Sequence, residues 1–258
     1  MKKICFLTSG IVGIFLSGII GCSHAPNPAI NPQLYYQIPN IKIFGITPDY
    51  YAGIDGLQNK ELIYKLNQII SNYTPVDYKS AKRYMFTRID NISGTVEGIY
   101  SGIKIHTNVI PDDKIMNTEH SWPQSKFASL PGDLREKAKS DILHLFPADS
   151  KINSIRGNKP YANISNGQIL TGGSKTDKSY FEPRDVVKGD IARAIFYFSV
   201  KYNLPVDSKQ EAVLKEWNIK DPVDKHEKDR MEMIYTNVQH NRNPFIDMPE
   251  LISKIADF

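Results

Sequence analysis

A carboxylate and an imidazole stand side by side near the middle of this 258-residue sequence. Glu119 can offer hard oxygen atoms to a cation such as magnesium or calcium. His120, with an ordinary pKa of about 6.5, is largely neutral at pH 7 and can accept a proton from water. Neighbouring residues of a regular strand point to opposite faces. Both side chains can therefore serve one site only if the backbone leaves the strand there, which the nearby Pro123 favours.

A second polar group lies at the start of a short predicted helix. Asp149 or Ser150 can cap that helix, which places Asn153 about one turn into it. The amide oxygen of Asn153 can provide a second hard ligand without adding charge. Arg156 follows, and a guanidinium suits bidentate contact with a phosphate. Alone, this pattern also fits a capping Asn on a solvated basic helix. Combined with the carboxylate and imidazole, it predicts a metal-dependent nuclease site.

The other histidines in this region carry weaker signals. His144 stands in the short apolar run 142–146, where a buried structural role is the simpler interpretation. His106 alternates with Ile103 and Ile105 in a β-prone run, as a surface residue of a half-buried strand would. The sequence has no His-Glu-x-x-His signature, which argues against a zinc metalloprotease.

Hydrophobic periodicity predicts the elements that must position these residues. Helices are predicted at residues 58–73, 183–202, 209–217 and 224–239. Short β-prone runs are predicted at residues 84–86, 95–105 and 142–146, and a long loop with one helical turn at 127–140. Since helical patterns dominate the later part and no repeat is present, the sequence predicts one mixed α+β domain with helices concentrated in the C-terminal half.

The first residues have the plan of an export signal. A positively charged start precedes the uncharged apolar residues 4–20, as in a secretory signal peptide. The stretch Ile-Ile-Gly-Cys at 19–22 resembles the lipobox of bacterial lipoproteins, in which the cysteine is acylated. We therefore expect residues 1–21 to be a lipoprotein signal peptide. The alternatives are an ordinary signal peptide and an uncleaved anchor helix. Acyl chains on Cys22 would anchor the protein to a bacterial membrane, facing the periplasm or the cell exterior.

The remainder of the chain divides into a tether and one domain. Residues 22–35 are proline-rich and predict an extended, flexible tether, and 36–258 form the predicted nuclease domain. The two cysteines, Cys5 and Cys22, lie in and at the end of the leader, so the domain has neither a disulfide nor a cysteine-ligated zinc site. The formal charge of +4 would fall by two with loss of the leader, which is a weak indication of polyanion binding.

The combined motifs resemble those of the endonuclease I family, which comprises secreted or periplasmic bacterial nucleases with a ββα-metal (His-Me finger) core. The resemblance covers most of residues 50–249. The stretches that carry it are Glu119-His120-Ser121-Trp122-Pro123-Gln124-Ser125, Leu145-Phe146-Pro147, Asn153-Ser154-Ile155-Arg156-Gly157-Asn158, Pro183-Arg184-Asp185, Lys188-Gly189-Asp190-Ile191-Ala192-Arg193-Ala194 and Asn241-Arg242-Asn243-Pro244-Phe245-Ile246-Asp247.

The resemblance implies a role for each candidate residue. It makes His120 the general base, and Glu119 and Asn153 the ligands of one divalent metal, usually Mg²⁺, with Ca²⁺ or Mn²⁺ as alternatives. It also implies an arginine that steadies the phosphate, for which Arg156 is the candidate. Two positions depart from the family pattern, because Leu143 stands where a second His is frequent and His240 where a Gly is usual.

The expected activity is that of a hydrolase, an endonuclease acting on the phosphodiester bonds of DNA and also of RNA. Contact mainly through phosphates would give little sequence preference. We expect a monomer whose partners are its nucleic-acid substrates and, through the lipid, a membrane. The alternative is a non-catalytic surface lipoprotein that binds a polyanion or glycan. Intact Glu119, His120 and Asn153 argue against it, because a binding module needs no base.

Overall fold

The computed structural model of the protein describes residues 49–258. The predicted signal peptide (1–21), the predicted tether (22–35) and the predicted acylation site Cys22 lie outside the described residues. No helix within 49–258 is long and apolar enough to cross a membrane.

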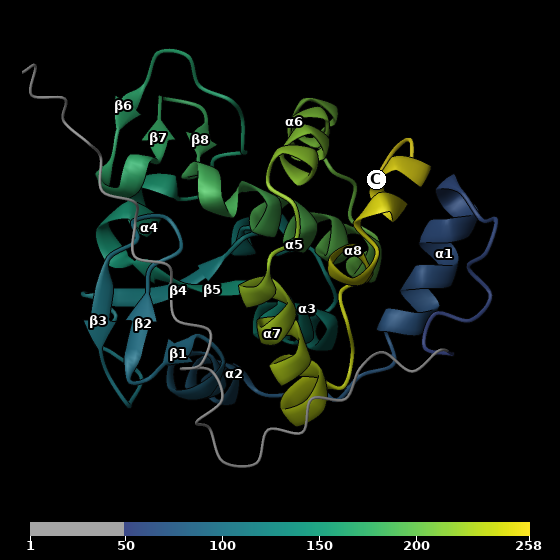
Figure 1. Cartoon of the computed structure of the whole chain (residues 1–258), viewed down its shortest axis with the longest axis horizontal. Helices are drawn as coiled ribbons and strands as arrows, with labels where there is room; N and C mark the ends of the chain where they lie inside the picture. Colours follow the sequence, from purple (N-terminus) through teal and green to yellow (C-terminus); the bar gives the residue numbers. More distant parts are fainter. Residues whose placement is uncertain (1–48) are drawn as a thin grey trace, which may run out of the picture. The chain divides into compact units, whose positions relative to one another are not determined.

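Helices and short strands alternate in the first part of the described chain, and helices dominate after it (Figure 1). The helices are α1 (Asn59–Ile70), α2 (Tyr78–Tyr84), α3 (Gly132–Ser140), α4 (Ser150–Arg156), α5 (Lys188–Tyr202), α6 (Ser208–Lys220), α7 (Lys225–Ile234) and α8 (Pro244–Asp247). The strands are β1 (Asn91–Ile92), β2 (Thr95–Glu97), β3 (Lys104–His106), β4 (Met116–His120), β5 (Leu145–Asp149), β6 (Gln168–Ile169), β7 (Lys175–Thr176) and β8 (Phe181–Glu182).

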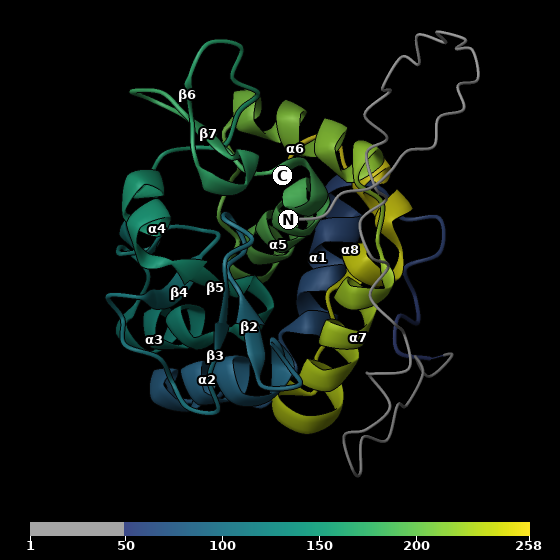
Figure 2. The same cartoon turned by 60° about the vertical axis from the view of Figure 1, so that its left-hand side comes forward.

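Helix α5 forms the centre of the packing. Figures 1 and 2 show it between the strand-bearing side, with α4, and helices α1 and α8. The predicted apolar stripe, which includes Ile191, Ile195 and Phe198, is buried. Its other faces are buried too, since even Arg193 and Lys201 are covered. A helix enclosed on all sides in this way is a core helix rather than an amphipathic surface helix.

The strands form three small antiparallel sheets: β1-β2-β3, β4-β5 and β6-β7-β8. In the central pair, Met116 lies opposite Asp149 and His120 opposite Leu145. Helix α4 follows β5 directly, with Asp149 as its N-cap accepting from the backbone N–H of Ile152. Gly157, at φ +55°, ends it. The β4–β5–α4 unit therefore brings the two candidate stretches of sequence together.

Three local predictions are wrong. Residues 132–140, predicted as part of a loop, form α3, because Pro131 precedes a helix with Asp133 in its first turn and lysines in its last. Residues 84–86 are helical, not β: α2 continues into a π-helical turn, Met85–Ile89, whose apolar side chains are buried at helical spacing. Residues 142–144 form a 3₁₀ turn capped by Asp141, so the predicted strand begins only at Leu145.

The larger predictions are confirmed. Helices occur at α1, α5, α6 and α7, although α5 begins at Lys188 because a strand and a 3₁₀ turn occupy residues 181–187. His106 is an exposed residue of β3. The described chain is a single α+β domain with its helices concentrated in the C-terminal half.

Candidate active site

The side chain of Glu119, a residue of β4, points towards α4 and is only 1% exposed. Its Oε1 accepts from Arg156 Nη1 at 2.7 Å and from the Tyr100 hydroxyl at 2.9 Å. Burial raises the pKa of this carboxyl to about 7, while the charge of Arg156 and the Tyr100 hydrogen bond oppose the rise. Among the described residues, Oε2 has no hydrogen-bond partner. One oxygen of the carboxylate is therefore held by protein, and the other is left for a ligand.

Asn153 presents its amide oxygen to the same interface. Its Nδ2 donates to Asn117 Oδ1 at 2.7 Å and to the Thr118 carbonyl at 3.3 Å. These two donations fix the amide orientation and leave Oδ1 as an acceptor. Asn117 and Glu119 point to the same face of β4 because side chains alternate along a strand. Asn153 and Glu119 thus belong to one contact region between α4 and β4.

This pair of oxygens suits a hard divalent cation. Among the described residues, no group of three or more His, Cys, Asp or Glu side chains is arranged to hold a metal. A cation bound to Glu119 and Asn153 would complete its coordination with water and substrate oxygen atoms. That pattern is typical of Mg²⁺, which keeps several waters and takes few protein ligands.

His120 is 5% exposed and is oriented by a backbone carbonyl. Its Nε2 lies 3.0 Å from the Lys139 carbonyl oxygen, which can only accept. The ring proton is therefore on Nε2, and Nδ1 carries the lone pair. Gln124 Nε2 is 3.4 Å from Nδ1. Burial chiefly, with repulsion from His144, lowers the pKa of His120 to about 3. The imidazole is thus neutral across the physiological range.

The backbone does not leave the strand between the two candidate residues. Glu119 and His120 are both in regular register in β4, so their side chains point to opposite faces. Glu119 faces α4, whereas the ring of His120 lies 5.6 Å from Tyr78 and 5.4 Å from His144 between ring centroids. The strand ends at His120. One phosphodiester could meet both side chains only at this end of β4.

The guanidinium of Arg156, predicted from the sequence to contact phosphate, is hydrogen-bonded to other residues of the protein. Arg156 is 1% exposed. Besides Glu119, its guanidinium donates to the carbonyls of His120 at 2.9 Å and Ser121 at 2.7 Å. Its charged end also lies 4.7 Å from the centroid of the Tyr161 ring. This geometry makes Arg156 a group that holds Glu119 and the end of β4, with no surface for a phosphate.

His144 and His240 make local contacts with backbone carbonyls. His144 is fully buried and its Nε2 lies 2.8 Å from the Ala138 carbonyl oxygen. His240 is in the left-handed backbone region at φ +59°, where a glycine is favoured. Its Nδ1 lies 2.8 Å from the Tyr235 carbonyl oxygen, at the end of a helical segment.

Several residues at this site were not predicted from the sequence. The Lys139 carbonyl, which orients His120, is a backbone group without a residue-type signal. Tyr100 and Tyr161 come from a loop and an isolated bridge far from β4 in sequence. Asn117 could have been found, because its position two residues before Glu119 puts it on the same strand face.

Comparisons with known proteins show the family of the chain. The family model described as Endonuclease I matches residues 59–250. The extracellular ribonuclease of Bacillus subtilis (strain 168) is 34% identical over 235 residues, covering 81% of this chain and 78% of that protein. Endonuclease-1 of Buchnera aphidicola subsp. Acyrthosiphon pisum (strain APS) is 28% identical over 221 residues, covering 82% and 80%. The periplasmic deoxyribonuclease of Aeromonas hydrophila is 29% identical over 116 residues, covering 43% and 48%.

The fold, the site and these similarities define a nuclease, a hydrolase acting on phosphodiester bonds. The chain belongs to the endonuclease I family. That membership places it among enzymes rather than among non-catalytic binding proteins.

Proposed function

We propose that this protein is a metal-dependent, largely sequence-nonspecific endonuclease that hydrolyses DNA and RNA. The observation that carries the proposal is the pair of oriented groups at β4. Glu119 offers one free carboxylate oxygen on the α4 side, and His120 offers a neutral imidazole on the other. A phosphodiester at the end of β4 would be reached from both sides.

Glu119 and Asn153 are the proposed ligands of one divalent cation, Mg²⁺, with Ca²⁺ or Mn²⁺ as substitutes. Bound there, the cation would neutralise charge that develops on the phosphate and assist departure of the 3′ oxygen. The orientation of both ligands is already fixed in the protein, since Arg156 and Tyr100 hold Glu119 and Asn117 holds Asn153. Such preorganisation lowers the cost of assembling the site.

His120 is the proposed general base. Its Nε2–H donates to the Lys139 carbonyl, which fixes the ring and directs the proton-accepting capacity to Nδ1. The imidazole takes a proton from water as that water attacks phosphorus in line with the leaving oxygen. The products then carry 5′ phosphates. The low pKa of His120, caused mainly by burial, keeps the base in its accepting form.

Contact with the phosphodiester is assigned to Lys139 rather than to Arg156. The ammonium of Lys139 contributes to the lowered pKa of His120, which places its charge near the imidazole. It lies 4.9 Å from the centroid of the Tyr78 ring, on the His120 side of β4. Arg156 acts on the reaction through Glu119, because its guanidinium is enclosed.

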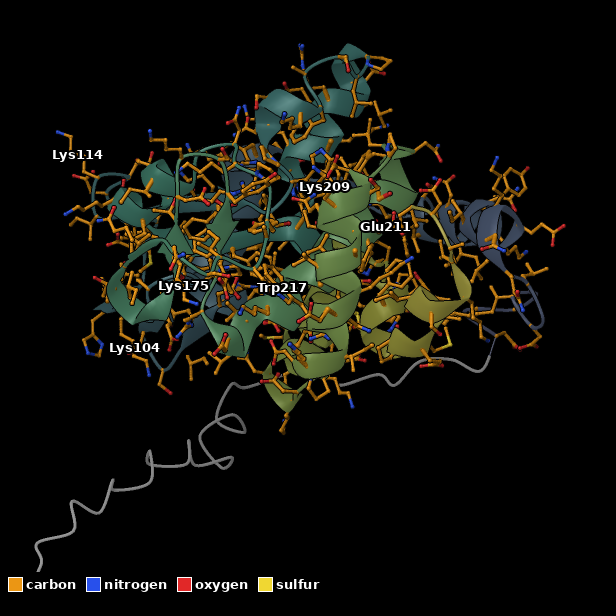
Figure 3. The ribbon with its side chains drawn as sticks, turned by 90° about the horizontal axis from the view of Figure 1, so that it is seen from above. Lys104, Lys114, Lys175, Lys209, Glu211 and Trp217 are labelled. Atoms are coloured by element: carbon orange, nitrogen blue, oxygen red, sulfur yellow. The ribbon has the colours of Figure 1, made fainter. Side chains whose placement is uncertain are left out.

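The names of the relatives support both substrates. Two Bacillus relatives are named extracellular ribonucleases, and the Aeromonas hydrophila relatives are named deoxyribonucleases. Lys104 and Lys114 lie at the outer margin of the side that carries the strands (Figure 3), where they add attraction for a polyanion. We infer that the protein acts as an exported monomer, anchored by acyl chains on Cys22 in front of a tether. Mass spectrometry of Cys22→Ala against the native chain tests the anchor, and a native chain without acyl mass would refute it.

Cleavage of supercoiled plasmid and of structured RNA, each with and without chelator, tests the function. Cleavage should stop with chelator and return with Mg²⁺. Glu119→Gln and Asn153→Ala should each require more Mg²⁺, because a hard cation with few protein ligands cannot spare one. His106→Ala, an exposed histidine of β3, is the matched control and should match the native rate. Full activity of Glu119→Gln and Asn153→Ala at low Mg²⁺ would refute the metal assignment.

A further inference from the structure

The phenols of Tyr161 and Tyr100 form a row of hydrogen bonds that ends at Oε1 of Glu119. The Tyr100 hydroxyl is 2.9 Å from Glu119 Oε1, and the Tyr161 hydroxyl is 2.6 Å from that of Tyr100. All three groups are buried. Tyr100 donates its single hydroxyl proton to Glu119 Oε1. Tyr161 then donates to Tyr100, and the row has one direction, from Tyr161 to Tyr100 to Glu119.

The hydrogen bonding of the Tyr161 hydroxyl is linked to that of Tyr100. Once Tyr161 donates to Tyr100, its more distant contact with the Ser121 carbonyl, at 3.4 Å, can take little of that proton. Both hydroxyls are buried, and each has a single proton to donate. Successive hydrogen bonds polarise one another in a low-dielectric interior, so the bond to Glu119 is strengthened by the one behind it.

Residues later in the chain hold the backbone on which the two tyrosines stand. The backbone of Tyr100 is held by Ser174 Oγ, which donates to its carbonyl at 2.7 Å. Arg184 Nε donates to the neighbouring Ile99 carbonyl at 2.8 Å. The Tyr161 N–H donates to Gln210 Oε1 of α6 at 2.7 Å. The loop that carries Tyr100 and the segment that carries Tyr161 are thus held by contacts beyond β4 and α4 as well.

We propose that Tyr100 and Tyr161 are positioning residues that tune the metal affinity of Glu119. The inference rests on the proposed function, in which Glu119 is a metal ligand. Both donors to the carboxylate, Tyr100 and Arg156, use Oε1. They fix the side-chain rotamer so that Oε2 is the oxygen presented to a cation. Outer partners of this kind typically change metal affinity by about 10- to 100-fold when removed.

The test measures metal binding directly, without substrate. Titration calorimetry of the full chain with Mn²⁺, and with Mg²⁺ in parallel, gives Kd for Tyr100→Phe, Tyr161→Phe and the double variant. Tyr100→Phe should raise Kd about 10-fold. Tyr161→Phe should raise it less, and the double variant should match Tyr100→Phe, because Tyr161 acts through Tyr100.

A matched control separates positioning from a general loss of stability. The Tyr51 hydroxyl also donates to a carboxylate, Asp247 Oδ2 at 2.6 Å, and is nearly as buried. Tyr51→Phe should lower the melting temperature by a similar amount and leave the metal Kd unchanged. If Tyr100→Phe does not fold, Tyr161→Phe carries the test alone, since it keeps the bond to Glu119.

The outcomes distinguish this inference from the proposed function. If Glu119→Gln abolishes binding and both phenylalanine variants bind Mn²⁺ within about twofold of the native Kd, the positioning role is wrong and the metal site stands. An additive double variant would refute the one-directional row. If Glu119→Gln itself binds Mn²⁺ as tightly as the native protein, Glu119 is not a ligand, and the proposed metal site and the positioning role both fail.

Discussion

Replacing Arg156 with methionine separates the role suggested by sequence from the role shown by structure. A phosphate-contacting surface arginine could be lost at little cost, within about 0.5 kcal/mol of native stability. In the structure, Arg156 is enclosed and pairs with buried Glu119 at 2.7 Å. Removing one partner of a buried ion pair typically costs about 3–5 kcal/mol, because an uncompensated charge remains. The carbonyls of His120 and Ser121 lose their donors as well, so we expect the upper part of that range.

Urea unfolding followed by tryptophan fluorescence measures this loss. The double variant Arg156→Met/Glu119→Gln should recover part of the stability, since a neutral amide no longer leaves a bare charge in the interior. Arg135→Met is the control, because Arg135 is exposed on α3 and should change stability by less than about 0.5 kcal/mol. If Arg156→Met unfolds at the native urea concentration and mainly raises KM for DNA, the enclosed ion pair is wrong and the phosphate contact is right.

Other substitutions probe the remaining groups. His120→Ala should lower kcat by about 10² to 10⁴ at saturating Mg²⁺ while still binding DNA; a rate within a few-fold of native would remove it as the base. Lys139→Ala keeps the backbone carbonyl that orients His120 and removes only the ammonium group. It should raise KM and reduce the salt slope of DNA binding by about 0.9, or about 0.7 for single strands. Lys137→Ala, exposed on the same helix, is the control, and equal effects of the two variants would contradict the assignment. Burial would raise the pKa of Asp141, but Lys201 and other partners lower it overall. The stabilisation that ionised Asp141 provides is therefore present above its unfolded pKa of about 3.9 and lost as pH falls through its folded pKa. The free energy of unfolding of Asp141→Asn should approach that of the native protein only below about pH 4. A constant difference between the two proteins in acid would refute the linkage.

Local sequence signals worked where one element decides its own structure. The apolar stripe of α5 predicted a helix because its period matches 3.6 residues. Asp149 predicted the start of α4, since its side chain caps the next turn whatever packs around it. The same logic failed at residues 84–86 and 127–140. Aromatic residues suggested strand in the first, and proline with charge suggested loop in the second. At residues 84–86, packing against neighbouring helices selected a helical backbone. At residues 132–140, the acidic first turn and the lysines of the last turn favoured a helix.

The sequence by itself determined which chemical groups the site contains. The adjacency of Glu119 and His120 and the spacing to Asn153 are properties of the sequence itself. The proposal of a hard cation and a neutral base rests on them. Only the tertiary structure decided the direction in which each side chain points and the residues that it contacts. Strand register put Glu119 and His120 on opposite sides of β4, and burial turned Arg156 from a candidate phosphate contact into the partner of Glu119. The backbone carbonyl of Lys139 and the phenols of Tyr100 and Tyr161 come from distant segments. Contacts between distant segments arise from the packing of the whole chain, so no local pattern of residues could reveal them.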